Sequence, residues 1–320
     1  AAYKIAELEL EQKYDEDIHA SYFDAFDFEH LNEQDLGYMR PVIVIDEAVN
    51  IAEDTGGFIG MMSGGAPVKI IAVNRFGDKA TPHSAGLSSH ELAALAIFRR
   101  NAYVFQGALD NPQLLHDALC KGMQIPLPAL WNLLIADSGI SARSEAVMLK
   151  AAVHSRYFPR IEFDIQTGAR FGSHLHVKSN KDPQMDFPVF KMDVGSEKDS
   201  VEYEFVLTMA DFMAATPANR NMLQCIPSGY DSEDLILLSE YLVQNPALMS
   251  GEVPFIRVVD EDNILRKAVV PLSWLAECRT RLEYWQFLQE LGGTKSYHTM
   301  RAIEKVKLDM EEEKEAEIEK

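Results

Sequence analysis

The sequence has little cysteine, few basic residues and no long apolar run. Its 320 residues include only Cys120, Cys225 and Cys278, which lie far apart in the chain. An odd number of isolated thiols argues against a disulfide framework and is typical of a reducing cytoplasm. An iron–sulfur cluster usually needs four thiolates, so this segment is not expected to hold one by itself. We predict a cytoplasmic location, with Cys120 buried in a helix.

Basic residues are outnumbered, with 30 bases against 50 acids and a net charge of −20. Phosphate backbones repel such a chain unless its cations gather in one patch, and no patch is present. The longest uncharged apolar runs, such as 125–136, are shorter than the roughly 20 residues that span a bilayer. We therefore expect neither a nucleic-acid partner nor a membrane-embedded protein.

Both ends of the sequence carry acidic helical patterns. Apolar residues recur every three to four positions within 1–30, and 303–320 hold eight acids and four lysines. These patterns predict a helical lead-in over 1–38 and a charged helical tail over 294–320. We interpret the chain as an excised part of a larger polypeptide.

The region 39–170 alternates strand and helix patterns. Continuous runs of apolar, often β-branched residues predict strands at 42–45, 68–73, 103–105 and 129–135. Helical patterns separate or follow these runs at 89–100, 112–121 and 144–155. This alternation predicts an α/β fold with a mostly parallel sheet and helices on both faces. Ligands of such sheets bind at the carboxyl ends of the strands, so the residues just after each strand are the ones to inspect.

The composition changes beyond about residue 165. Residues 171–200 are polar and turn-rich, and we interpret them as an excursion or linker. A smaller α+β unit is predicted over 201–293, with a hairpin at 253–270 and a helix at 274–288 that ends before Gly292.

Five stretches occur in an order known from one enzyme family. They are PVIV at 41–44, APVKII at 66–71, NAYV at 101–104, PALWNL at 128–133 and HSRYFPR at 154–160. The last is similar to a segment that reads ESGYWPLYR in the family. Over roughly 40–165 the chain resembles the C-terminal thiamine-diphosphate domain of pyruvate:ferredoxin (flavodoxin) oxidoreductases.

This resemblance implies a thiamine-diphosphate-binding fold within a 2-oxoacid:acceptor oxidoreductase-like polypeptide. It implies thiamine diphosphate with Mg²⁺ as cofactors, and iron–sulfur clusters only in other parts of the full chain. Other domains or subunits, and ferredoxin or flavodoxin, would be its partners, and we expect an oligomer. If the chain is active, it decarboxylates a 2-oxoacid on the cofactor.

The chain departs from the family at both cofactor motifs. Asp46-Glu47-Ala48 stands where the family has Gly-Asp-Gly. The Asn of the family's Asn-Thr-Gly-Gly loop falls at Ala80, or the loop is deleted if 79–82 match a later KATP stretch. The resemblance leaves five candidate cofactor-binding residues, of which Glu47 and Asn74 are also candidate metal ligands. They are Asp46, Glu47, Asn74, Asp78 and Thr81.

Two interpretations follow from these departures. In the first, the chain is the thiamine-diphosphate-fold region of an active oxidoreductase. In the second, it keeps the fold without the chemistry, as a structural or regulatory domain that pairs with an active module. Magnesium needs oxygen ligands, and a diphosphate needs close backbone approach without added carboxylates. We therefore predict that this copy does not bind thiamine diphosphate in the usual way.

Two further patterns were weighed as sites. His174 and His176 could contribute two ligands to a zinc ion, but zinc needs three or four and a polar loop is the simpler interpretation. The glycine-rich stretches 55–57 and 63–65 could cradle a phosphate. They lack the Lys-Ser/Thr of a P-loop, so we predict structural turns there.

Overall fold

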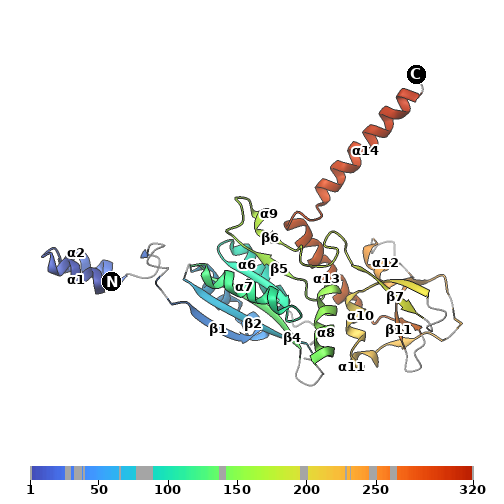
Figure 1. The fold of residues 1–320 in the computed structure, drawn as a ribbon, viewed down its shortest axis with the longest axis horizontal. Coiled ribbons are helices and arrows are strands. Elements are labelled where there is room, and N and C mark those ends of the chain that lie inside the picture. The colour runs from blue at the N-terminus through green and yellow to red at the C-terminus, as the bar shows by residue number, and fades with distance from the viewer. Residues whose placement is uncertain are drawn as a thin grey trace.

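The described residues form three β-sheets. Helices pack around them (Figure 1). This computed structural model describes residues 2–25, 30–31, 38, 40–64, 66–76, 89–136, 142–194, 201–227, 229–230, 232–244, 251–259 and 265–318. The predicted α/β class is confirmed.

The largest sheet has six strands, in the spatial order β1-β2-β4-β3-β5-β6. They are β1 (Val42–Glu47), β2 (Val68–Phe76), β3 (Tyr103–Ala108), β4 (Ala129–Ala136), β5 (Ile161–Phe163) and β6 (Leu175–His176). The first four are parallel to one another, and all four strands predicted from apolar runs are confirmed. β5 pairs antiparallel with β3, and β6 with β5, so the sheet is mixed.

Helices cover both faces of this sheet because successive strand side chains point to opposite sides. On one face, Ile70, Val104 and Leu130 pack in a core that includes residues of α4, α5, α6 and α13. These helices are α4 (Ala48–Glu53), α5 (Thr55–Ser63), α6 (Leu92–Arg99) and α13 (Leu272–Leu291). On the other face, Phe105 and Trp131 pack with α7 (Pro112–Gln124). The predicted helix at 112–121 is confirmed.

Helix α7 is fixed at both ends. Asn111 caps its start, where the side-chain Oδ1 accepts a hydrogen bond from the Leu114 amide at 3.1 Å. At its end, the buried Lys69 of β2 donates from Nζ to three backbone carbonyls of 122–127, at 2.7–2.8 Å. Burial lowers the pKa of Lys69 to about 8. Lys69 therefore satisfies carbonyls that the helix end leaves without partners.

The glycine-rich stretch 55–65 is not a pair of turns, which corrects our prediction. Helix α5 spans most of it. The Asp54 side chain caps this helix by accepting from the Gly57 amide at 3.0 Å, and Phe58 and Met62 are buried in the core. Burial of these two side chains outweighs the low helix propensity of glycine.

The remainder of the chain is built on two smaller sheets. Strands β7 (Val189–Val194) and β8 (Val201–Val206) pair antiparallel. The four-stranded sheet has the order β10 (Leu235–Leu237), β11 (Val253–Val259), β12 (Leu265–Val269) and β9 (Gln224–Cys225). β11 and β12 form the predicted hairpin. The segment 171–200, expected as a linker, contributes α9 (Phe171–His174), β6 and β7.

Helix α13 belongs to two cores. Trp274, Cys278 and Leu282, in its first half, are buried in a core with Ile256, Ala268 and the helices α10 (Met209–Ala214) and α12 (Leu238–Val243). Trp285 and Leu288, in its second half, are buried against the six-stranded sheet. The predicted helix at 274–288 is confirmed, and it joins the two parts of the chain.

The described parts of both terminal regions contain helices. Helices α1 (Ala2–Leu10) and α2 (Glu16–Asp24) bury no residue, and α14 (Tyr297–Ile318) projects away from the rest of the molecule (Figure 1). Across the described ranges, no helix is both long and apolar enough to cross a membrane.

Candidate functional site

Three of the candidate cofactor residues, Asp46, Glu47 and Asn74, lie toward the carboxyl ends of β1 and β2. In the parallel register, Asp46 is opposite Ala72 and Glu47 is opposite Val73. Side chains alternate along a strand, so Asp46 and Asn74 belong to one face of the sheet and Glu47 to the other. The two candidate metal ligands, Glu47 and Asn74, therefore start from opposite faces.

Glu47 forms an ion pair with the neighbouring strand. Arg75 Nε donates to Glu47 Oε1 at 2.9 Å, and the two side chains are 41% and 39% exposed. Arg75 follows Asn74 directly and lies on the same face as Glu47. The Glu47 carboxylate, at the position where the resemblance implies an aspartate, is thus held by a guanidinium from its own sheet.

Asp46 is engaged locally. Its Oδ1 accepts hydrogen bonds from the Glu47 amide at 2.8 Å and from Asn50 Nδ2 at 2.9 Å. Helix α4 begins at Ala48, directly after β1, so no loop separates the strand from the helix. Ala48 is 1% exposed and belongs to the core. The position where the resemblance implies a glycine is therefore occupied by a packed methyl group.

Asn74 is part of a row of buried amides that crosses the sheet. Its Nδ2 donates to Asn132 Oδ1 of β4 at 2.7 Å, and also approaches the Leu133 carbonyl at 3.3 Å. Asn132 Nδ2 donates to Gln106 Oε1 of β3 at 3.0 Å and to the Ser89 carbonyl at 3.2 Å.

Gln106 completes the row, because its Nε2 donates to the Pro159 carbonyl at 3.0 Å. Asn74 is only 6% exposed, and Asn132 and Gln106 are fully buried. The row links three neighbouring strands and the segment before β5, which is a structural role.

The remaining candidates, Asp78 and Thr81, and the position Ala80 all lie outside the described residues. In the part of the chain that the structure describes, no group of three or more His, Cys, Asp or Glu side chains could hold a metal ion. His174 ends helix α9 and its Nε2 lies 3.1 Å from the Gly168 carbonyl, while His176 is in β6.

The described strand ends do not fit a magnesium diphosphate. Glu47 and Asn74 are engaged by Arg75 and Asn132, on opposite faces of the sheet. Mg²⁺ needs several oxygen ligands converging on one octahedral centre. A diphosphate placed here would also meet the carboxylates of Asp46 and Glu47, whose charge has the same sign.

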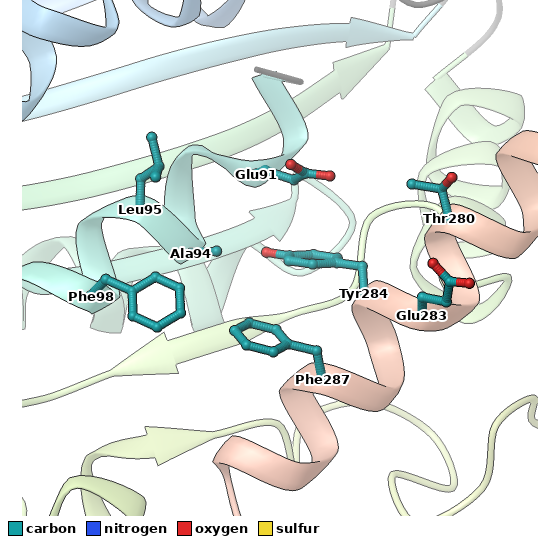
Figure 2. A pocket seen from close by; sticks show the side chains of 8 residues that line it. All are labelled: Glu91, Ala94, Leu95, Phe98, Thr280, Glu283, Tyr284 and Phe287. Atoms are coloured by element: carbon teal, nitrogen blue, oxygen red, sulfur yellow. The ribbon is translucent and has the colours of Figure 1, made fainter. Parts of the chain in front are cut away.

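A second candidate site is an apolar groove between α6 and α13 (Figure 2). It measures about 380 Å³ and its lining includes Phe98 and Phe287, whose ring centroids are 5.8 Å apart. Glu91 and Glu283 contribute carboxylates, and burial raises the pKa of Tyr284. Among the described residues that line the groove, none pairs a nucleophile with a base. Sequence patterns did not reveal it because its two helices are far apart in the chain.

His90 is the most strongly perturbed histidine near this groove. It lies in the 3₁₀ turn 89–91, with ring centroids 4.8 Å from Tyr157 and 5.4 Å from Phe158. Burial, with a smaller contribution from Arg281, lowers its pKa well below the ordinary value. His90 is therefore a neutral ring packed among aromatic side chains.

Arg156 is an important residue that the sequence patterns did not single out, although it lies in the HSRYFPR stretch. Its guanidinium carbon is 4.0 Å from the Trp285 ring centroid. Nη2 donates to the Lys181 and Asp182 carbonyls at 2.8 and 3.0 Å. Arg156 thus connects the end of α8 (Ala142–His154) to the 181–186 segment and to α13. Its role is structural.

Cys120 is exposed, which corrects the prediction that it is buried. Its Sγ lies 3.7 Å from Nε2 of His116, one turn earlier on α7.

The sequence matches no protein-family model and no curated protein.

Proposed function

We propose that this chain is a non-catalytic structural or regulatory α/β region of a 2-oxoacid:acceptor oxidoreductase-like polypeptide in the cytoplasm. The resemblance over 40–165 supplies the family and the thiamine-diphosphate fold in this proposal. The geometry at the strand ends supports the part of the proposal that this chain does not bind the cofactor.

The observation that carries the proposal is the engagement of Asn74. Both hydrogens of its amide nitrogen are directed into the sheet, at Asn132 and Leu133. A metal would bind the side-chain oxygen of Asn74, and turning the amide out of its present orientation to present that oxygen would break the Nδ2 bond. The side-chain oxygen of Asn132 would then lose its 2.7 Å donor in a buried position. Such an orphaned buried group costs about 1–3 kcal/mol. Asn74 is therefore better suited to holding β2 to β4 than to holding a metal.

Two features at β1 support the same proposal. The strand continues into α4 without a loop, so the backbone amides of 46–48 lie in a strand-to-helix junction rather than in a glycine turn. The Glu47–Arg75 pair also places a cation where a diphosphate site could use one, but that cation already has its carboxylate. The arrangement is complete without a ligand.

Calorimetric titration with thiamine diphosphate and Mg²⁺ tests the proposal. We expect no saturable heat up to about 1 mM cofactor, which corresponds to a binding free energy weaker than about −4 kcal/mol. Mg²⁺ titrated alone serves as the blank. Micromolar binding that saturates at one cofactor per chain would contradict the proposal.

Glu47→Ala is the matched variant for this titration. If the strand ends no longer serve as a site, the variant and the parent give the same titration. A parent that binds, together with a Glu47→Ala variant that binds at least tenfold more weakly, would restore the enzymatic interpretation and assign Glu47 to the cofactor.

A further inference from the structure

Strand β1 is an edge strand with exposed apolar side chains. Within the described residues it pairs with β2 alone, at the first position of the sheet. Val42, Ile43 and Ile45 are 61%, 50% and 67% exposed. An edge strand offers a row of unpaired backbone donors and acceptors, and proteins usually protect such edges with charges, bulges or a covering element. Between Val42 and Ile45 this strand has no charge and no proline.

Both faces of β1 contribute to this exposed surface. Val42 belongs to the face that α4, α5 and α6 cover, whereas Ile43 and Ile45 belong to the face of α7. The core under α7 reaches Ile71 of β2 and includes no residue of β1. Of the helices that the structure describes, none buries Ile43 or Ile45.

The charges at the two ends of β1 are complementary to each other. Arg40 precedes the strand, and Asp46 and Glu47 end it. Arg40 and Asp46 are both exposed. When two copies of such a strand run antiparallel, the basic end of each lies beside the acidic end of the other.

A single two-fold register satisfies all of these side chains. An axis perpendicular to the sheet keeps each face continuous across the two copies and places one residue opposite itself. With Ile43 on the axis, every apolar residue faces an apolar residue and each arginine faces an aspartate. The remaining pairs are Val42 with Val44, Pro41 with Ile45, and Arg40 with Asp46.

The registers on either side are worse. With Val42 on the axis, Arg40 lies opposite the apolar Val44. With Val44 on the axis, Val42 lies opposite Asp46 and Pro41 opposite Glu47. Both pairs would place a carboxylate against an apolar side chain. The charge pattern therefore selects the register centred on Ile43.

We propose that β1 pairs antiparallel with β1 of a second copy of this chain, with Ile43 on the two-fold axis. The two six-stranded sheets become one continuous sheet of twelve strands across the pair. The pairing covers the outer edge of β1 and places Ile43 and Ile45 in cross-strand apolar pairs. It does not depend on whether the strand ends bind a cofactor.

Site-directed disulfide trapping tests the register. In a background with Cys120→Ser and Cys225→Ser, Ile43→Cys places two thiols directly opposite, with Cβ atoms about 5 Å apart, so a disulfide-linked dimer is expected under mild oxidation. Ile45→Cys is the matched control. Its two copies lie four residues out of register, about 13 Å along the strand, and should not cross-link. Equal cross-linking of both variants, or of neither, would overturn the proposal.

Sedimentation equilibrium of the unmodified chain tests the association itself, and a monomer at all concentrations up to about 100 μM would overturn the proposal. Arg40→Glu is expected to weaken the dimer at least tenfold, and the double variant Arg40→Glu/Asp46→Arg to restore it. Circular dichroism checks that each variant is folded. If Asp46→Arg unfolds the chain, the Arg40→Glu result and the disulfide trapping still test whether β1 pairs with β1 of a second copy.

Discussion

Replacing Asn132 by leucine is the most direct test of the buried amide row. Asn132 is fully buried at the centre of the row, between Asn74 on β2 and Gln106 on β3. Leucine is similar in volume, so the substitution removes hydrogen bonds and leaves little cavity. The Asn74 amide loses its better acceptor, and the Gln106 side-chain oxygen and the Ser89 carbonyl each lose a donor.

The magnitude follows from the three groups that lose a partner. Each orphaned buried polar group costs about 1–3 kcal/mol, so Asn132→Leu should destabilise the fold by at least about 3 kcal/mol. Asn74 keeps a 3.3 Å contact with the Leu133 carbonyl, which places its own contribution at the lower end of the cost per group. Urea denaturation followed by circular dichroism and by tryptophan fluorescence measures it.

A double-mutant cycle separates this effect from a general packing defect. Asn74→Leu added to Asn132→Leu removes the orphaned donor, so the double variant should be at least about 0.5 kcal/mol more stable than additivity predicts. Strict additivity, or an Asn132→Leu variant within 0.5 kcal/mol of the parent, would refute the assignment of Asn74 to the row.

Three further predictions concern other buried polar groups. Burial, with Arg160 nearby, lowers the pKa of His154 to about 4, so the fold holds this ring neutral while the unfolded chain protonates it below about 6.5. Between pH 7 and pH 4 the free energy of unfolding should therefore fall by up to about 3 kcal/mol more in the parent than in the His154→Gln variant. Parallel plots of unfolding free energy against pH for the two proteins would contradict this. Lys69→Met leaves three carbonyls at the end of α7 without their donor, and should destabilise the fold by about 3 kcal/mol or more, measured by thermal or urea denaturation. Arg156→Lys loses the planar fork over Trp285, so it should destabilise by about 2 kcal/mol and shift the tryptophan emission; an unchanged spectrum and midpoint would exclude this role.

The strands and long helices could be predicted because their signals are local. A few consecutive residues are enough to indicate the β-branched run of β1, the Asn111-Pro112 start of α7, and the hairpin of β11 and β12. Helix α5 could not be predicted in this way. Its glycines oppose a helix locally, and only the burial of Phe58 and Met62 against the sheet favours it.

The neighbourhood of the candidate residues could be predicted, but not the partners of their side chains. Asp46, Glu47 and Asn74 follow apolar runs, and parallel strands bring their carboxyl ends to one edge of the sheet. The partners of these side chains are not local. Asn132 is 58 positions from Asn74, and Arg75 is 28 positions from Glu47. No spacing pattern within one segment encodes such pairs.

Helix α13 makes the two halves of this protein interdependent. A chain divided at the 171–200 segment would leave Trp285 and Leu288 on one fragment and the sheet that covers them on the other. Each fragment would then expose an apolar surface to water and tend to aggregate. The apparent modules are therefore expected to melt together, as one cooperative transition, and neither is a promising unit for separate expression.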